Sequence, residues 1–164
     1  MRIFLIFFIS VVFFSFLFGY EEYGVFFIPE LKMVQGNNTI ETLFGGRAIT
    51  FIENFSFGFG AYKAPFKLLG YAGLDLGYQF KPWDFMDIHL HGLVGYGTGG
   101  FYMEPSVSVL YNPFPFLRVG INLGYVIVSG LGYLGLKTDW ENENALRGIS
   151  FGIQVSGGIS TPVK

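Results

Sequence analysis

The chain has 164 residues, which is the length of a single domain. Only 13% of its residues are charged, whereas 51% are hydrophobic and 20% aromatic, and a soluble domain carries roughly 25% charged residues. This composition leaves too little polar surface for an ordinary water-exposed monomer. The formal net charge is −2 and no cluster of Lys and Arg occurs, so we expect no nucleic-acid partner.

Glycine and cysteine usage narrows the class of protein further. The 24 glycines argue against a bundle of membrane helices, because each glycine weakens a helix by about 1 kcal/mol. The chain contains no cysteine, which excludes disulfides, thiolate metal sites and a cysteine nucleophile. We expect no cofactor.

The first 19 residues have the features of an export signal. Met1 and Arg2 precede an apolar run that reaches Gly19, and a basic start with a long apolar core is typical of a secretory signal peptide. Cleavage after Gly19 would place Leu17 two residues before Gly19, at a position where signal peptides usually have a small residue. The alternative is an uncleaved anchor helix, because about 17 apolar residues just span a bilayer. We expect residues 1–19 to be a removed signal peptide.

The rest of the chain alternates between apolar and polar residues with a period of two. This period predicts strands, because successive side chains of a strand point to opposite faces. No later segment is apolar over the roughly 18 residues that a spanning helix needs. Eight strands are predicted, over Val25–Val34, Ile40–Ile52, Phe55–Tyr62, Gly70–Phe80, Met86–Tyr96, Phe101–Tyr111, Phe116–Val128 and Arg147–Gly157.

The two faces of the predicted strands differ in charge. In the segment 116–128, Ile121 and Leu123 lie on an apolar face, whereas Arg118 and Asn122 lie on the other. Across all eight strands the apolar face has no charge, and the other face carries charges of both signs among glycines and serines. An even number of strands of about ten residues, apolar outside and polar inside, is the pattern of a transmembrane barrel. The sequence therefore predicts an all-β fold over residues 20–164, an eight-stranded antiparallel up-and-down transmembrane β-barrel.

The predicted connections alternate in length. Short turns are expected at Glu53-Asn54, Lys81–Asp84 and Asn112–Pro115, whereas the connection Ser129–Leu146 is the longest. Short periplasmic turns and longer external loops are the usual asymmetry of outer-membrane barrels. Aromatic residues gather at both predicted rims, as in interfacial girdles.

Glycine and proline mark two local features. The glycine-rich stretch Gly95–Gly100 is predicted to be a hairpin turn, because a phosphate-binding glycine loop needs a helix after it and a strand follows here. Pro105 lacks an N–H group and would interrupt a ladder of hydrogen bonds. We therefore expect a bulge or late pairing near Pro105.

Four ordered segments carry a family resemblance. They are LFGGRA (43–48), GYAGLDLGY (70–78), FYMEPSVSVLYN (101–112) and RVGINLGYVIVSG (118–130). Together they resemble a family of small, mostly uncharacterised bacterial outer-membrane β-barrel proteins of the OmpA/OmpX-like size class, over about Leu43 to Gly158. The resemblance implies a barrel in the bacterial outer membrane with no established activity. The chain departs from the family in having Asp75 where the family tends to have Glu, and in ending with ISTPVK rather than an aromatic strand residue.

The polar face supplies the candidate site residues. They are Arg47, Asp75, His89, His91, Glu104 and Arg118. Because an eight-stranded barrel is only wide enough for its own side chains, we expect these residues to form a structural charge network in the lumen. The alternative is a selectivity ring in a conducting pore. The i, i+2 spacing of His89 and His91 also suits zinc, but lumenal packing is favoured and no metal site is predicted.

No catalytic or cofactor-binding residue is predicted. Some eight-stranded outer-membrane enzymes trim lipid A with Ser/His/acid catalysis at the lipid-facing surface or rim, whereas both histidines here point inward. We therefore expect no enzyme.

The sequence favours a structural or surface-interaction role, with outer-membrane lipid around the barrel. A surface partner would bind through the loop 129–146, which carries Asp139, Glu141 and Glu143. Two alternatives stay open: a narrow transport channel, and a soluble secreted barrel that carries a ligand in an apolar interior.

Overall fold

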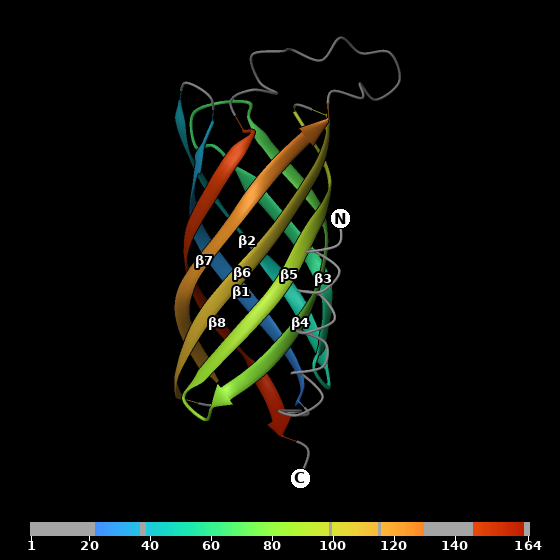
Figure 1. Cartoon of the computed structure of the whole chain (residues 1–164), viewed down its shortest axis with the longest axis vertical. Helices are drawn as coiled ribbons and strands as arrows, with labels where there is room; N and C mark the ends of the chain where they lie inside the picture. The colour runs from blue at the N-terminus through green and yellow to red at the C-terminus, as the bar shows by residue number, and fades with distance from the viewer. Residues whose placement is uncertain (1–21, 37–38, 99, 115, 130–145, 163–164) are drawn as a thin grey trace, which may run out of the picture.

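The computed structural model describes residues 22–36, 39–98, 100–114, 116–129 and 146–162. The expected signal peptide and residues 130–145 of the expected partner-binding loop lie outside these ranges. Eight strands form: β1 (Glu22–Gln35), β2 (Ile40–Ile52), β3 (Phe55–Lys63), β4 (Gly70–Trp83), β5 (Met86–Gly97), β6 (Gly100–Phe114), β7 (Leu117–Ser129) and β8 (Gly148–Pro162). Consecutive strands pair antiparallel and β8 also pairs with β1 (Figure 1). The predicted eight-stranded up-and-down barrel is confirmed.

The strands are strongly staggered around the barrel. From Tyr23 in β1, successive paired residues lead once around the sheet and return to β1 at Met33, ten residues further along. The path runs through Tyr23, Ile52, Phe55, Tyr78, Leu90, Val107, Leu123, Phe151 and Met33. Such a stagger tilts eight strands by roughly 35–45°, which leaves an interior of side-chain width.

The outer wall is apolar, as the alternation predicted. Outward side chains such as Phe27, Phe59, Leu74 and Leu123 are each more than half exposed. An apolar surface around a whole barrel far exceeds the patches of a few hundred Å² that soluble monomers expose. Within the described ranges, no helix is long and apolar enough to cross a membrane.

The inward face is less uniformly polar than predicted. Buried apolar side chains occupy it at both ends of the barrel, with charged residues between them. The cluster near the long connections contains Val34, Leu43, Tyr62, Ala64, Leu69, Tyr71, Leu93, Tyr102, Val126, Val128 and Leu146. The cluster nearer the short turns contains Phe26, Ile28, Ile49 and Phe51. The lumen is therefore filled by side chains. Most of its polar residues lie in the middle, whereas Gln79, Asp87 and Arg118 lie beside the cluster near the short turns.

Two bulges lengthen the strands at the short-turn end. The register shifts between Phe80 and Trp83 in β4 and between Tyr111 and Phe114 in β6. Each shift spans a proline, which has no N–H group to give to a ladder. The turns predicted at 81–84 and 112–115 are therefore wrong in extent, because both strands continue through most of these residues.

Pro105 causes no bulge and no late pairing, so that expectation is wrong. It pairs with Gly92 in an unshifted β5–β6 register. Towards β7 the ladder stops after Met103 and resumes at Ser106 with the same register. The proline therefore interrupts pairing on one side without adding a residue to the strand. The predicted hairpin at 95–100 is confirmed in its described part, where Gly97 pairs with Gly100.

Candidate functional site

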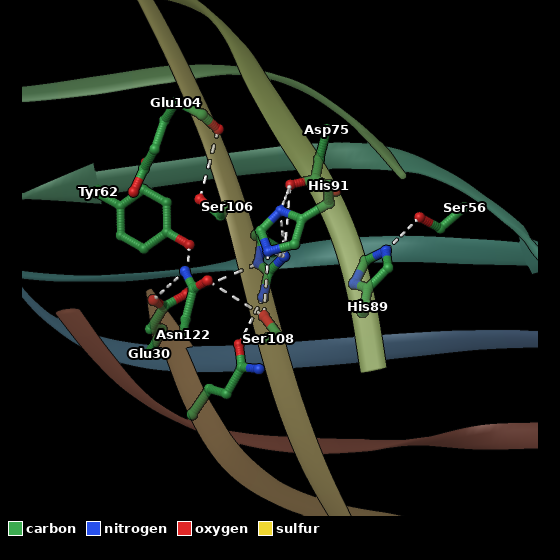
Figure 2. A network of polar contacts seen from close by, with 12 residues as sticks. Glu30, Ser56, Tyr62, Asp75, His89, His91, Glu104, Ser106, Ser108 and Asn122 are labelled. Atoms are coloured by element: carbon green, nitrogen blue, oxygen red, sulfur yellow. Dashed lines mark hydrogen bonds and ion pairs between the residues drawn. The ribbon is translucent and has the colours of Figure 1, made fainter. Parts of the chain in front are cut away.

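The candidate site is the group of charged and polar side chains inside the barrel. All six residues predicted for the lumen are less than a tenth exposed, and they come from five different strands: Arg47, Asp75, His89, His91, Glu104 and Arg118. Closure of the barrel turns the polar faces of these strands toward one another (Figure 2).

Arg47 of β2 is the centre of the group. Its Nη1 lies 2.8 Å from each ring nitrogen of His91 and 3.5 Å from Asp75 Oδ2. Its Nη2 donates to Gln154 Oε1 over 2.5 Å, and its Nε lies 3.8 Å from Glu30 Oε2. One guanidinium group therefore joins β2 to β1, β4, β5 and β8.

A chain of hydrogen bonds extends from His91 around the lumen. Its Nδ1 lies 3.0 Å from Asp75 Oδ2, and its Nε2 lies 3.1 Å from Ser108 Oγ. Because a carboxylate accepts, this contact favours the tautomer with a proton on Nδ1. The single hydroxyl proton of Ser108 can be donated either to His91 Nε2 or to Asn122 Oδ1, which lies 3.3 Å from Oγ. Asn122 Nδ2 donates to Glu30 Oε1 over 3.0 Å.

Glu104 of β6 is the acceptor in a second, connected group. Lys32 Nζ lies 2.9 Å from both of its carboxylate oxygens. Tyr71 donates to Oε2 over 2.7 Å, and Ser150 donates to Oε1 over 2.6 Å. Lys32 Nζ also lies 3.9 Å from Glu30 Oε1, so this group is joined to that of Arg47.

Arg118 of β7 lies nearer the short-turn end. Its Nη1 lies 3.2 Å from Asp87 Oδ2 and donates to Gln79 Oε1 over 3.0 Å. Its guanidinium carbon lies 4.0 Å from the ring centroid of Phe26 and 5.5 Å from that of Phe51. Arg118 therefore combines an ion pair with stacking on the apolar cluster of that end. Its partner Asp87 was not in the predicted set.

The lumenal charges balance one another. The six predicted residues do not show this balance, because they leave out several of the charged partners. Among the described residues, the carboxylates of Glu30, Asp75, Asp87 and Glu104 lie against the cations of Lys32, Arg47, Lys81 and Arg118. The prediction omitted half of them although the same alternation places them on the polar face. The buried carboxylate of Glu41, near the long connections, pairs with Lys67. Glycines make room for these groups, because a β-carbon on Gly152 would overlap the Glu30 carboxylate and one on Gly77 would overlap the His89 ring.

The two histidines do not converge on a common point. His89 Nε2 lies 2.7 Å from Ser56 Oγ, whereas His91 contacts Arg47 and Asp75. Their rings stack with centroids 4.7 Å apart. Among the described residues, no group of three His, Asp or Glu side chains has the arrangement of a metal site. The cation of Arg47 against His91 also opposes a second positive charge there.

The Ser56–His89 pair lacks the third member of a catalytic triad. The His89 Nδ1 atom has no hydrogen-bond partner among the described residues, and the nearby carboxylate of Asp75 faces His91 instead. Ser56 is 3% exposed and His89 0%, so a lipid substrate outside the wall would not reach them.

An apolar outer wall around an enclosed, charge-balanced lumen defines the chain as a transmembrane β-barrel of eight strands. A solved structure of a designed barrel ("De novo design of transmembrane beta-barrels") is similar, with a TM-score of 0.56 and 13% identity over 84% of this chain and 95% of that one. This likeness concerns the fold alone.

Two natural proteins are weaker matches. Neisserial surface protein A (NspA) has a TM-score of 0.43 and 16% identity, over 86% of this chain and 97% of that one. Ail, the attachment invasion locus protein of Yersinia pestis, has a TM-score of 0.47 and 10% identity, over 86% and 99%. No protein-family model and no curated protein sequence matches the chain, so the family resemblance seen in the sequence stays a prediction.

Proposed function

We propose that the protein is a non-conducting barrel of the bacterial outer membrane with a structural or surface-interaction role and no catalytic activity. The observation that carries this proposal is the filled lumen. The groups of polar side chains around Arg47 and Glu104 fill its middle, and their residues are at most 8% exposed. Near the long connections, Tyr71 stacks on Tyr102 with ring centroids 4.9 Å apart and lies 5.4 Å from the ring of Tyr62.

The proposed orientation rests on the connections. Three short turns and the barrel ends of β1 and β8 share one end, which we assign to the periplasm. The opposite end carries the longer connections, including the one between Ser129 and Gly148. A surface partner would contact this end, because connecting segments on a rigid barrel are free to vary in sequence without disturbing the wall.

Two alternatives are less well supported. A soluble ligand carrier needs an apolar interior and a polar exterior, which is the opposite of the observed distribution. A narrow channel needs a continuous aqueous path, and the paired charges of the lumen stand in its way. A single experiment nevertheless distinguishes a channel clearly from the proposed non-conducting barrel.

Conductance across planar bilayers tests the proposal. We expect refolded protein, checked by heat-dependent gel migration, to insert without stepwise currents. A permeating ion would have to separate the lumenal ion pairs, and this would leave buried charges without partners. The control is Glu104→Gln, which neutralises one lumenal carboxylate. Reproducible current steps that change in size or ion selectivity in this variant would show that the lumen conducts, and would overturn the proposal.

A further inference from the structure

A groove of about 550 Å³ lies on the outer wall at the end with the long connections. This volume falls within the range of small-molecule pockets. Its floor is formed by Ala61, Gly70 and Ala72, and Phe44 and Tyr96 stand on either side. These side chains belong to the outward face, so the groove opens toward the surroundings of the barrel and not into the lumen.

Strand register explains why a hollow forms here. Ala61 of β3 is paired with Ala72 of β4, which places two small side chains next to each other on the wall. Ala72 is in turn paired with Tyr96 of β5. Phe44 of β2 is paired with Lys63, the last residue of β3. Small residues therefore lie between aromatic side chains, and the resulting hollow is bordered by a lysine at the rim.

The lysine at the rim is available for an anion. Lys63 is exposed and has no ion-pair partner among the described residues. Lys67 in the adjoining loop differs, because its Nζ lies 2.6 Å from Glu41 Oε1. The same loop projects two apolar side chains, Leu68 at 87% exposure and Phe66 at 97%. Leu68 also lines the groove, so the site combines apolar walls with a cation, Lys63, that has no ion-pair partner in the described part of the chain.

We propose that this groove holds one acyl chain of a lipid with an anionic head group, and that Lys63 pairs with the head-group phosphate. An unbranched chain matches a shallow hollow floored by alanine and glycine. A phosphate matches an exposed lysine at the end of a strand, where the wall meets the head-group region. The proposal rests on the membrane location given under the proposed function.

Native mass spectrometry of delipidated protein in detergent tests the site. Titration with dipalmitoylphosphatidylglycerol and with dipalmitoylphosphatidylcholine compares an anionic and a zwitterionic head group on identical chains. We expect the first molecule of the anionic lipid to bind about fivefold more tightly, the effect of one lysine near a membrane surface. In the variant Lys63→Gln the two lipids should bind equally, whereas Lys67→Gln should keep the preference because Lys67 is engaged by Glu41.

Filling the groove provides a test that does not depend on charge. Ala72→Phe should abolish tight binding of the first lipid, because the ring occupies the floor. Ala48→Phe is the matched control, since Ala48 lies on the outward face of β2 opposite Phe27 and does not line the groove. Both variants should first show heat-dependent gel migration, and Ala61→Leu replaces Ala72→Phe if the latter does not fold.

Two results would overturn the proposed lipid site. One is equal affinity of the wild type for both lipids, which indicates unspecific contact with surrounding lipid. The other is equal binding by Ala72→Phe and Ala48→Phe. Membrane fractionation is a separate readout: a chain that is absent from membranes contradicts the proposed function, whatever lipid it binds in detergent.

Discussion

Replacing Arg47 with alanine is expected to lower the free energy of unfolding by about 3–5 kcal/mol. The reason is that the substitution leaves the carboxylates of Glu30 and Asp75 buried without the cation that lies between them. It also removes the donor to Gln154. Urea unfolding of the protein in lipid vesicles, followed by tryptophan fluorescence, measures the loss.

Arg147→Ala is the matched control for this prediction. Arg147 is exposed directly before β8, and its replacement should change the unfolding free energy by less than about 0.5 kcal/mol. Asp75→Asn completes a double-mutant cycle with Arg47→Ala, and the coupling between the two sites should be clearly non-zero. Equal, small effects of Arg47→Ala and Arg147→Ala would refute the stabilising role of the network.

Glu104→Ala is expected to cost about 3–4 kcal/mol in the same assay. The substitution removes the carboxylate that lies 2.9 Å from the ammonium group of Lys32, and Lys32 is only 1% exposed. It also removes the acceptor for Tyr71 and Ser150. The double variant Lys32→Met/Glu104→Leu should recover most of the loss, because a buried pair replaced by apolar side chains of similar size is often neutral.

The rim ion pair supplies the contrast for Glu104. Glu41 lies 2.6 Å from Lys67, whose side chain is 60% exposed. Only the Glu41 side chain is buried, at 8% exposure, so Glu41→Ala leaves behind a cation that water already solvates. A pair with such an exposed partner contributes about 0–1 kcal/mol, and Glu41→Ala should be mild. If Glu104→Ala were no more destabilising than Glu41→Ala, burial of the lumenal charges would not determine their contribution to stability.

Strands and faces could be predicted from the sequence because they depend on local alternation. The face of the sheet on which Ile121 or Arg118 lies follows directly from its position in the strand. The choice of ion-pair partner could not be predicted, since it depends on register between distant strands. Lys32 and Glu104 are 72 residues apart, and Arg47 and Gln154 are 107 apart.

The inward apolar clusters escaped prediction for a related reason. Phe26 and Phe51 are apolar residues on the face that carries the charges, so alternation gives no signal for them. Their rings meet edge to face, with centroids 5.7 Å apart, only after β1 and β2 have paired. The bulges of β4 and β6 give no distinct signal either, because a proline near the end of a strand is as typical of a turn as of a bulge.

A cysteine scan through Ile121, Asn122 and Leu123 of β7 tests the central claim most directly, because the chain has no cysteine of its own. In lipid vesicles, nitroxides on Ile121→Cys and Leu123→Cys should collide with oxygen but not with a water-soluble nickel chelate. The thiol of Asn122→Cys should resist a charged, water-soluble thiol reagent until the barrel is unfolded. Reaction at 122 in the folded protein would reveal an open aqueous lumen, and collision of the nickel chelate at 121 and 123 would show that this face is not in lipid.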